Sequence, residues 1–353
     1  MLMKKMLAAA FAGGLMLAAG SASAQTVGPQ GETATPSSGL TLSDADIAAL
    51  KDKGYKAALL WHTSSDFTNA VTAGATDEFA RAGITIAVKT DAQFDAARQR
   101  SDIETALAAK PNVILALPLD PVTSAEAFRQ ATKDGVKLVF LSNLPKDYKQ
   151  GTDYASIVTD DLYQMGKQAA DAMAKAIGGK GKVGYIFHDA TYYVTNQRDQ
   201  SFKKTIEKDY PDIKIVAEQG ISDPARAEEL ANAMLLQHPD LDGIYVTWAE
   251  PADGVLSALR GAGNKHTKIV TLDLAEPVAL DMVKGGNVAA LVADKAYELG
   301  RAMAASGMKS LLGQQTPAFV VAPALTVTKD NVSQGWKDSL NRDAPQSVLD
   351  AAK

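Results

Sequence analysis

Short runs of apolar residues alternate with amphipathic stretches along most of the chain. Continuous apolar strands that alternate with helices are typical of parallel sheets covered on both faces. The pattern predicts ten strands, at 57–61, 84–88, 113–117, 138–141, 156–158, 183–187, 213–216, 243–246, 269–272 and 288–293. Because ten strands in about 300 residues are more than one such domain usually holds, we predict an α/β fold of two doubly wound domains.

The stretches between the strands predict the helices. Apolar positions three or four residues apart indicate helices over 124–134, 163–177 and 224–237. Ser43 is expected to cap a short helix over 44–53. Residues 25–39 are polar and rich in Gly, Pro, Ser and Thr, which indicates a flexible leader.

The first 24 residues have the features of a secretory signal peptide. Lys4 and Lys5 form a basic segment, and residues 6–19 are an apolar stretch too short to span a bilayer comfortably. Residues 22–24 read Ala-Ser-Ala, which is the A-x-A form of a cleavage site. We therefore expect export to the periplasm and a mature chain that starts near Gln25.

Charge and cysteine content exclude several classes of function. The 353 residues include 36 basic and 41 acidic side chains, a net charge of −5, and no cysteine. Without Lys4 and Lys5 the balance is 34 against 41, or −7. An acidic chain without a basic block is a poor nucleic-acid binder. The lack of cysteine excludes disulfides, thiolate metal sites and cysteine nucleophiles.

Polar, aromatic and acidic side chains follow several of the predicted strands. Ligands of open α/β sheets bind beyond the carboxyl ends of the strands, so these side chains are candidate contacts. The richest stretch is 185–202, YIFHDATYYVTNQRDQSF. The glycine-rich segment 178–184 lacks the spacing of a phosphate-binding loop and indicates a helix stop and a turn.

Arg198 is the strongest single candidate in that stretch. We expect a helix to begin near Asn196, which places Arg198 in the first turn, where a cation opposes the helix macrodipole. A residue that breaks a local rule needs another reason to be there. In the functional interpretation, the planar guanidinium group of Arg198 donates hydrogen bonds to two ligand hydroxyls. The structural alternatives are an ion pair with Asp199 or a clamp between the domains.

Acidic and aromatic side chains offer two further kinds of contact. Asp273 and Asp294 are candidate acceptors for vicinal hydroxyls, although each precedes a predicted helix and could serve as its N-cap. The aromatic residues at strand ends could stack on the C–H face of a sugar or could pack in a core. These are Trp61, Phe67, Tyr192, Tyr193 and Trp248, of which Phe67 and Trp248 are favoured because both have polar neighbours.

The sequence gives little support for a metal site or a hydrolase. The four histidines form no HxH or HExxH spacing, so no metal is expected, and His62 is a plausible hydrogen-bonding contact to a ligand. No G-x-S-x-G motif occurs. A secreted carbohydrate-active enzyme would need a catalytic pair of carboxylates, for which Asp273 and Asp294 are the candidates.

From about residue 56 to residue 327, the chain resembles the periplasmic sugar-binding proteins of ABC importers, of the ribose-binding type. The resemblance rests on HTSSDFTNAVTAGATDEFARAG, KPNVILALPLDPVTSAEAFRQATKDGVKLVFLSN, NQRDQSF, LLQHPDLDGIYVTWAEPADGVLSAL, KIVTLD and GGNVAALVADKAYELG. Six residues at four sites depart from the family pattern, and the changes at Ser142-Asn143, Trp248-Ala249 and Asp294 disfavour ribose itself as the ligand. Ser142-Asn143 replace Asp-Arg, Ser201 replaces Gly, Trp248-Ala249 replace Asn-Asp, and Asp294 replaces Gln.

The resemblance implies a type I periplasmic binding fold, with two Rossmann-like lobes joined by a three-crossing hinge. Lobe one is expected at 25–158 plus 295–323, and lobe two at 159–294 plus 324–353. Together with the strand-end argument, the resemblance implies a ligand site between the lobes. The expected contacts are His62, Thr63, Ser65, Phe67, Ser142, Asn143, Tyr193, Arg198, Ser222, Trp248, Asp273 and Asp294.

The function implied is that of a monomeric solute-binding protein without cofactor or metal. It would capture a small sugar or polyol in the periplasm and deliver it to the permease subunits of an ABC importer. One alternative is a protein that presents its ligand to a membrane sensor, in chemotaxis or quorum signalling. The less favoured alternative is the secreted carbohydrate-active enzyme.

Overall fold

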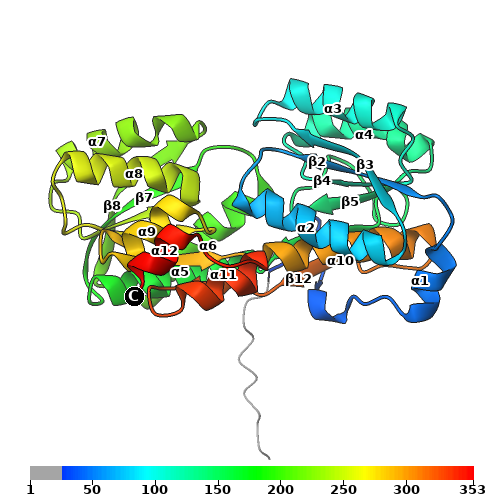
Figure 1. Ribbon diagram of the computed structural model, residues 1–353. Helices are drawn as coiled ribbons and strands as arrows, with labels where there is room; N and C mark the ends of the chain where they lie inside the picture. The colour runs from blue at the N-terminus through cyan, green and yellow to red at the C-terminus, as the bar shows by residue number, and fades with distance from the viewer. Residues whose placement is uncertain (1–25) are drawn as a thin grey trace, which may run out of the picture.

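The computed structural model describes residues 26–353, and the predicted signal peptide lies outside the described residues. Two sheets form the centres of two lobes (Figure 1). All strands of the first sheet are parallel, in the order β1 (Ala34–Pro36), β12 (Phe319–Ala322), β6 (Ser156–Asp160), β5 (Lys137–Leu141), β4 (Val113–Ala116), β2 (Lys56–Trp61) and β3 (Thr85–Asp91).

The second sheet is parallel except for one short edge strand. Its order is β13 (Leu325–Val327), β11 (Val288–Ala293), β10 (Lys268–Leu272), β9 (Gly243–Val246), β7 (Gly181–His188) and β8 (Ile213–Ile221), and only β13 is antiparallel to its neighbour. The ten predicted strands and the α/β fold class are therefore confirmed.

Helices cover both faces of each sheet, as the continuous apolar strands require. In the first lobe, α2 (Asp66–Arg81) and α10 (Ala296–Leu311) pack on one face, and α3 (Ala96–Ala108) and α4 (Pro121–Lys133) on the other. In the second lobe, α5 (Leu162–Ala176) and α6 (Tyr193–Asp209) cover one face. The helices α7 (Ala227–Gln237), α8 (Ala249–Gly261) and α9 (Glu276–Val283) cover the other.

The predicted helices are present, with small shifts at their ends. The helix expected over 44–53 is α1 (Asp44–Leu50), and Ser43 caps it in a reciprocal capping box with Asp46. The stretch 224–237 divides into the 3-10 turn η2 (Pro224–Arg226) and α7. After β13 the chain ends in α11 (Val332–Leu340), which contacts α2 and β13, and in α12 (Gln346–Ala351), which packs on α9.

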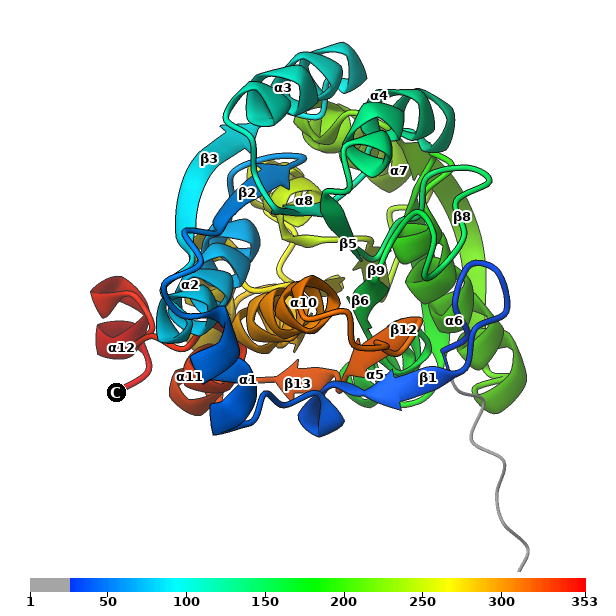
Figure 2. The ribbon, with the colours of Figure 1, turned by 90° about the vertical axis from the view of Figure 1, so that its right-hand side faces the viewer.

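The expectation of a flexible leader over 25–39 is wrong for its described part. Ala34–Pro36 form β1, which pairs in parallel with β12 at the edge of the first sheet (Figure 2), and η1 (Ser37–Gly39) follows it. The Thr26 hydroxyl is buried and donates to the Asp161 carboxylate at 2.6 Å. Three-residue edge strands carry no periodic signal, so composition alone suggested a loop.

The chain passes between the two sheets three times: from β6 to α5, from β11 to α10, and from β12 to β13. The lobe boundaries near 158, 294 and 323 remain a prediction, which this change of sheet supports. Asp160 ends β6, and Asp294 directly follows β11. Two carboxylates therefore lie where the chain crosses between the lobes.

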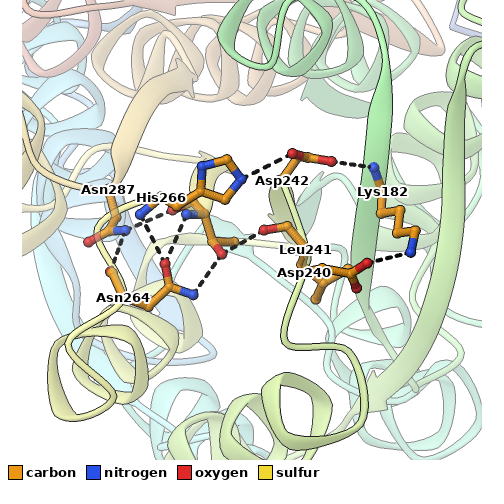
Figure 3. Close-up of polar contacts among 8 residues, drawn as sticks. Lys182, Asp240, Leu241, Asp242, Asn264, His266 and Asn287 are labelled. Carbon is orange, nitrogen blue, oxygen red and sulfur yellow. Dashed lines mark hydrogen bonds and ion pairs between the residues drawn. The ribbon is translucent and has the colours of Figure 1, made fainter.

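The amino-terminal edge of the second sheet is closed by a cluster of polar contacts (Figure 3). Asp242 accepts from the backbone N–H of Lys182, and Lys182 pairs with Asp240. Asn287 donates to the carbonyl oxygens of Asn264 and Thr267. These contacts connect the starts of β7, β9, β10 and β11. The edge that is open to a ligand is the opposite one, at the carboxyl ends of the strands.

Close packing of α2 on α10 leads to a prediction. A Cβ at Gly74 would collide with the carbonyl oxygen of Tyr297 in α10. Gly74→Ala should therefore destabilise the protein by about 1–3 kcal/mol, because helix backbones must move apart. Gly261→Ala, at the exposed end of α8 where a Cβ meets no atom, should stay within about 0.5 kcal/mol of the parent. Equal urea midpoints for both variants would contradict this packing argument.

Candidate functional site

A cavity of about 100 Å³ lies between the carboxyl ends of the two sheets. From the first lobe it is lined by residues that follow β2, β3, β4 and β5, and from the second by residues that follow β7, β9 and β10. Asp160 and Asp294 complete the lining at the chain crossings. The carboxyl ends of the parallel strands thus bring side chains from distant parts of the sequence into one cleft.

Ten of the twelve predicted contacts line this cavity. They are His62, Thr63, Ser65, Phe67, Ser142, Asn143, Arg198, Trp248, Asp273 and Asp294. Ser65 also caps α2 together with Thr68. Whether each residue touches a bound ligand stays a prediction.

Tyr193 and Ser222 do not line the cavity. The Tyr193 hydroxyl donates to the carbonyl oxygen of Val27, outside the cleft. Tyr192, its neighbour at the start of α6, lines the cavity instead, because adjacent helical residues point in different directions. Ser222 is exposed and follows β8, the outermost strand of its sheet. These two predicted positions are wrong as cleft residues.

Arg198 lies one turn further into its helix than the sequence indicated. The helix α6 begins at Tyr193, with Tyr192 as an extended N-cap residue whose side chain makes no capping hydrogen bond. The expected start at Asn196 is therefore wrong, because Tyr192 is not a typical N-cap residue and gave no signal. Since the macrodipole acts mainly within the first turn, it contributes little at Arg198.

The Arg198 guanidinium is held within the second lobe. Nη1 donates to Asp273 Oδ1 at 3.1 Å, and Nη2 donates to the carbonyl oxygen of Thr247 at 2.9 Å. Burial lowers the pKa of Arg198, but the carboxylates of Asp273 and Asp294 raise it, for a net upward shift. The side chain is 5% exposed, and its Nε has no partner among the described residues. It is neither paired with Asp199 nor a clamp between lobes.

Asp273 and Asp294 do not serve as helix N-caps. The N-cap residue of α9 is Ala275, and that of α10 is Lys295. Asp273 has a left-handed backbone with φ of +67°, as does Ser142 with +59° at the end of β5. Such backbones cost on the order of 1–3 kcal/mol and cluster at ligand sites. The capping alternative is therefore wrong for both aspartates.

Asp160 and Asp294 form a buried acidic pair beside Asp273. Burial raises the pKa of Asp160 to about 7, despite hydrogen bonds from Asp294 and from the backbone N–H of Lys295 that lower it. Burial and the charges of Asp273 and Asp160 raise the pKa of Asp294 well above its usual value. Asp160 was not among the predicted contacts, although its place at the end of a strand was a usable signal.

The raised pKa of Asp160 predicts how stability depends on pH. The folded state keeps this proton up to about pH 7, whereas the unfolded chain loses it near pH 3.8. This group's stabilisation is therefore lost as pH rises from about 4 to 7. The free energy of unfolding of Asp160→Asn, relative to that of the parent, should therefore rise by about 2–3 kcal/mol between pH 5 and pH 8.

Urea unfolding of both proteins at pH 5, 6, 7 and 8 measures this difference. Burial lowers the pKa of both His62 and His188 to about 4, which gives the opposite trend with pH. Those histidines are present in both proteins, so their contribution cancels, and the difference between the two curves reports on Asp160 together with Asp294, whose pKa the Asp160 charge raises. A difference that does not change with pH would mean that the Asp160 carboxyl ionises normally.

Aromatic rings form the apolar part of the cleft. Trp248 meets His188 edge-on at 4.9 Å between ring centroids, and His188 lies 4.9 Å from Tyr192. Because burial lowers the pKa of His188, this ring is neutral at pH 7. Trp61 points into the first lobe instead and donates to the Thr72 hydroxyl at 2.8 Å.

Asn143 makes a direct hydrogen bond between the lobes. Its Oδ1 accepts from the backbone N–H of Val194 at 3.3 Å, and its Nδ2 donates to the carbonyl oxygen of Pro118 at 3.0 Å. The neighbouring Ser142 hydroxyl lies 2.9 Å from the Thr159 hydroxyl. The amide of Asn143 is therefore occupied by protein partners and connects the two walls of the cleft.

The remaining lining residues were not among the predicted contacts. They are Asp66, Phe94, Leu117, Leu119, Asp160, His188, Tyr192, Val194, Thr195, Ala249, Glu250, Leu274 and Ala275. Most follow the same strand ends and could have been found by the same rule. Phe94 could not, because a left-handed turn at Gln93 and Phe94 brings it back to the cavity.

Residues 26–353 have neither a cluster of metal ligands nor a helix that could span a membrane. Within this range, no group of three or more His, Asp or Glu side chains could hold a metal ion. Likewise, none of the helices described there has the length and apolar character needed to cross a membrane.

Comparisons with known proteins agree on one family. The family model described as "Periplasmic binding protein domain" matches residues 57–315. A protein named "Putative rhizopine-binding protein" from Rhizobium meliloti is 23% identical over 69% of this chain and 80% of its own length. A "Xylitol-binding protein" from Mycolicibacterium smegmatis is 26% identical over 76% of this chain and 77% of its own.

Solved structures share the fold. An ABC transporter solute-binding protein from Agrobacterium vitis, bound with α-D-tagatopyranose, has a TM-score of 0.74 at 23% identity and covers 81% of this chain and 99% of its own. Another from Agrobacterium vitis, with bound allitol, has a TM-score of 0.68 at 23% identity, with coverages of 80% and 98%.

Proposed function

We propose, because the chain belongs to the family of periplasmic binding proteins, that it captures a small sugar or polyol in the cleft between its lobes. It then delivers this solute to the permease subunits of an ABC importer and acts as a periplasmic monomer. The observation that carries the proposal is the cavity between two strand-end walls, lined by one arginine fork, several carboxylates and aromatic rings.

The chemistry of the lining suits a polyhydroxylated solute. A polyol offers a row of hydroxyls and an apolar C–H face, so it needs hydrogen-bonding groups and flat rings together. Arg198 supplies donors, and Asp273 and Asp294 supply acceptors. Phe67 and Trp248 supply apolar faces. Relatives named for ribose, xylitol and D-allose support the same class of ligand.

The test is a thermal-shift screen of the mature chain against tetritols, pentitols, pentoses, hexoses and inositols. A ligand at 100 times its dissociation constant should stabilise the folded state by about 2.7 kcal/mol. Calorimetric titration of each hit should then give a one-to-one complex. A screen in which no solute shifts the melting temperature would contradict the proposal.

A further inference from the structure

The cavity has more carboxylates than cationic side chains. Arg198 is the cationic residue among its described lining, against the carboxylates of Asp66, Asp160, Glu250, Asp273 and Asp294. Asp273 pairs with Arg198, and Asp66 pairs with Arg342. Glu250 is exposed as a whole residue, although partial burial of its carboxyl group and the charge of Asp273 raise its pKa to about 7. The buried carboxyls without a cationic partner are therefore those of Asp160 and Asp294.

Among these carboxyl groups, that of Asp294 has the fewest hydrogen-bond donors and cationic partners. It is 4% exposed, and no N–H or cationic group in residues 26–353 donates a hydrogen bond to it. Its immediate neighbours are the carboxyls of Asp160 and Asp273. Asp160 accepts one backbone N–H, from Lys295 at 3.2 Å. This wall of the cavity therefore lacks a positive partner. Burying an unpaired charge is costly, so a cationic group of the ligand would be stabilised there.

We propose that the ligand carries an ammonium group in addition to hydroxyls, and that the ammonium binds against Asp294 and Asp160. The inference rests on the proposed solute-binding function and specifies its ligand class. An ammonium donates three hydrogen bonds and accepts none, which matches a wall of acceptors. The rings of Trp248 and Phe67 line the same cavity and can stabilise a cation over their faces.

The same contacts argue against an acidic ligand. The cation that an anion would need is Arg198, and two of its N–H groups are engaged by Asp273 and Thr247. A carboxylate or phosphate beside Asp160 and Asp294 would have to keep both carboxyls protonated, whereas an ammonium favours their charged form. The remaining rival is a neutral polyol, to which a protonated carboxyl of the pair donates.

Matched pairs of solutes, in which one hydroxyl of the first member is replaced by an ammonium group in the second, distinguish an ammonium ligand from a neutral polyol. The pairs are glycerol and 2-amino-1,3-propanediol, D-sorbitol and D-glucamine, and D-glucose and D-glucosamine, each titrated calorimetrically at pH 7. In at least one pair, the amino member should bind at least tenfold more tightly than its hydroxyl partner.

Two variants show where the ammonium binds. Asp294→Asn should weaken binding of that amino member at least tenfold and change the hydroxyl member less. Asp240→Asn is the control, because Asp240 lies at the opposite edge of the same sheet (Figure 3) and should leave both affinities unchanged. Should Asp294→Asn fail to fold, Asp160→Asn takes its place.

The outcomes distinguish this inference from the function on which it rests. Hydroxyl members that bind as tightly as their amino partners, or more tightly, would overturn the proposal of an ammonium ligand and leave the proposed solute binding intact. Binding by neither member of any pair, together with no hit in the wider screen, would contradict the proposed function and the inference with it. An equal loss in Asp240→Asn would also overturn the assignment to Asp294.

Discussion

Arg198→Ala should weaken ligand binding by a factor on the order of 100 to 1,000. Asp273 and Thr247 fix the orientation of the guanidinium, which leaves its buried Nε–H and other N–H groups for a ligand. Two charge-assisted hydrogen bonds contribute roughly 1.5–3 kcal/mol each, less the cost of rearrangement. Calorimetric titration with the ligand found by the screen measures the loss.

Two further variants show whether that loss of affinity comes from the charge or from the planar shape of the Arg198 side chain. Arg198→Lys keeps the charge but not the planar fork, and should recover only part of the affinity. Arg226→Ala removes an exposed arginine whose partner is Glu229 and should bind like the parent. An Arg198→Ala protein that binds with unchanged affinity would show that Arg198 only supports Asp273.

Asp199→Ala should lower the free energy of unfolding by about 3–5 kcal/mol. Asp199 is fully buried and accepts from the backbone N–H of His188 at 2.9 Å, the Tyr245 hydroxyl at 2.7 Å and the Thr247 hydroxyl at 3.0 Å. Its removal leaves three buried donors without an acceptor. This carboxylate therefore connects α6 to β7 and β9 below the cleft.

Urea unfolding measures this effect. Asp209→Ala, at the exposed end of α6, is the matched control and should change stability by less than about 0.5 kcal/mol. Similar midpoints for the two variants would mean that the three donors find other partners and that Asp199 is not a structural centre.

The central strands could be predicted because they are buried on both faces and are therefore continuously apolar. Runs such as Val113–Ala116 and Gly243–Val246 lie in the middle of their sheets and give a clear signal. The three strands that were missed have three or four residues, and two of them lie at a sheet edge. Their pairing depends on partners far away in the sequence, which local pattern cannot supply.

The site could be predicted as far as strand ends determine it. The rule located Arg198, Trp248 and Asp273 because each follows a parallel strand. It could not say that Tyr192 rather than Tyr193 enters the cavity, since this depends on where α6 begins. Nor could it show that the Asn143 amide bonds across the cleft, because that contact exists only when the lobes are in place.

The central claim is that the lobes close on a solute in this cleft, and a distance measurement tests it directly. The helices α4 and α7 both begin at the cleft edge, on different lobes (Figure 1). Because the chain has no cysteine, Val122→Cys and Glu228→Cys give two unique exposed sites for spin labels in these first turns. Double electron–electron resonance should give a shorter distance between the labels as the ligand saturates the protein. Arg198→Ala should shift that change to higher ligand concentration. A distance that stays the same at saturating ligand would contradict closure around a bound solute.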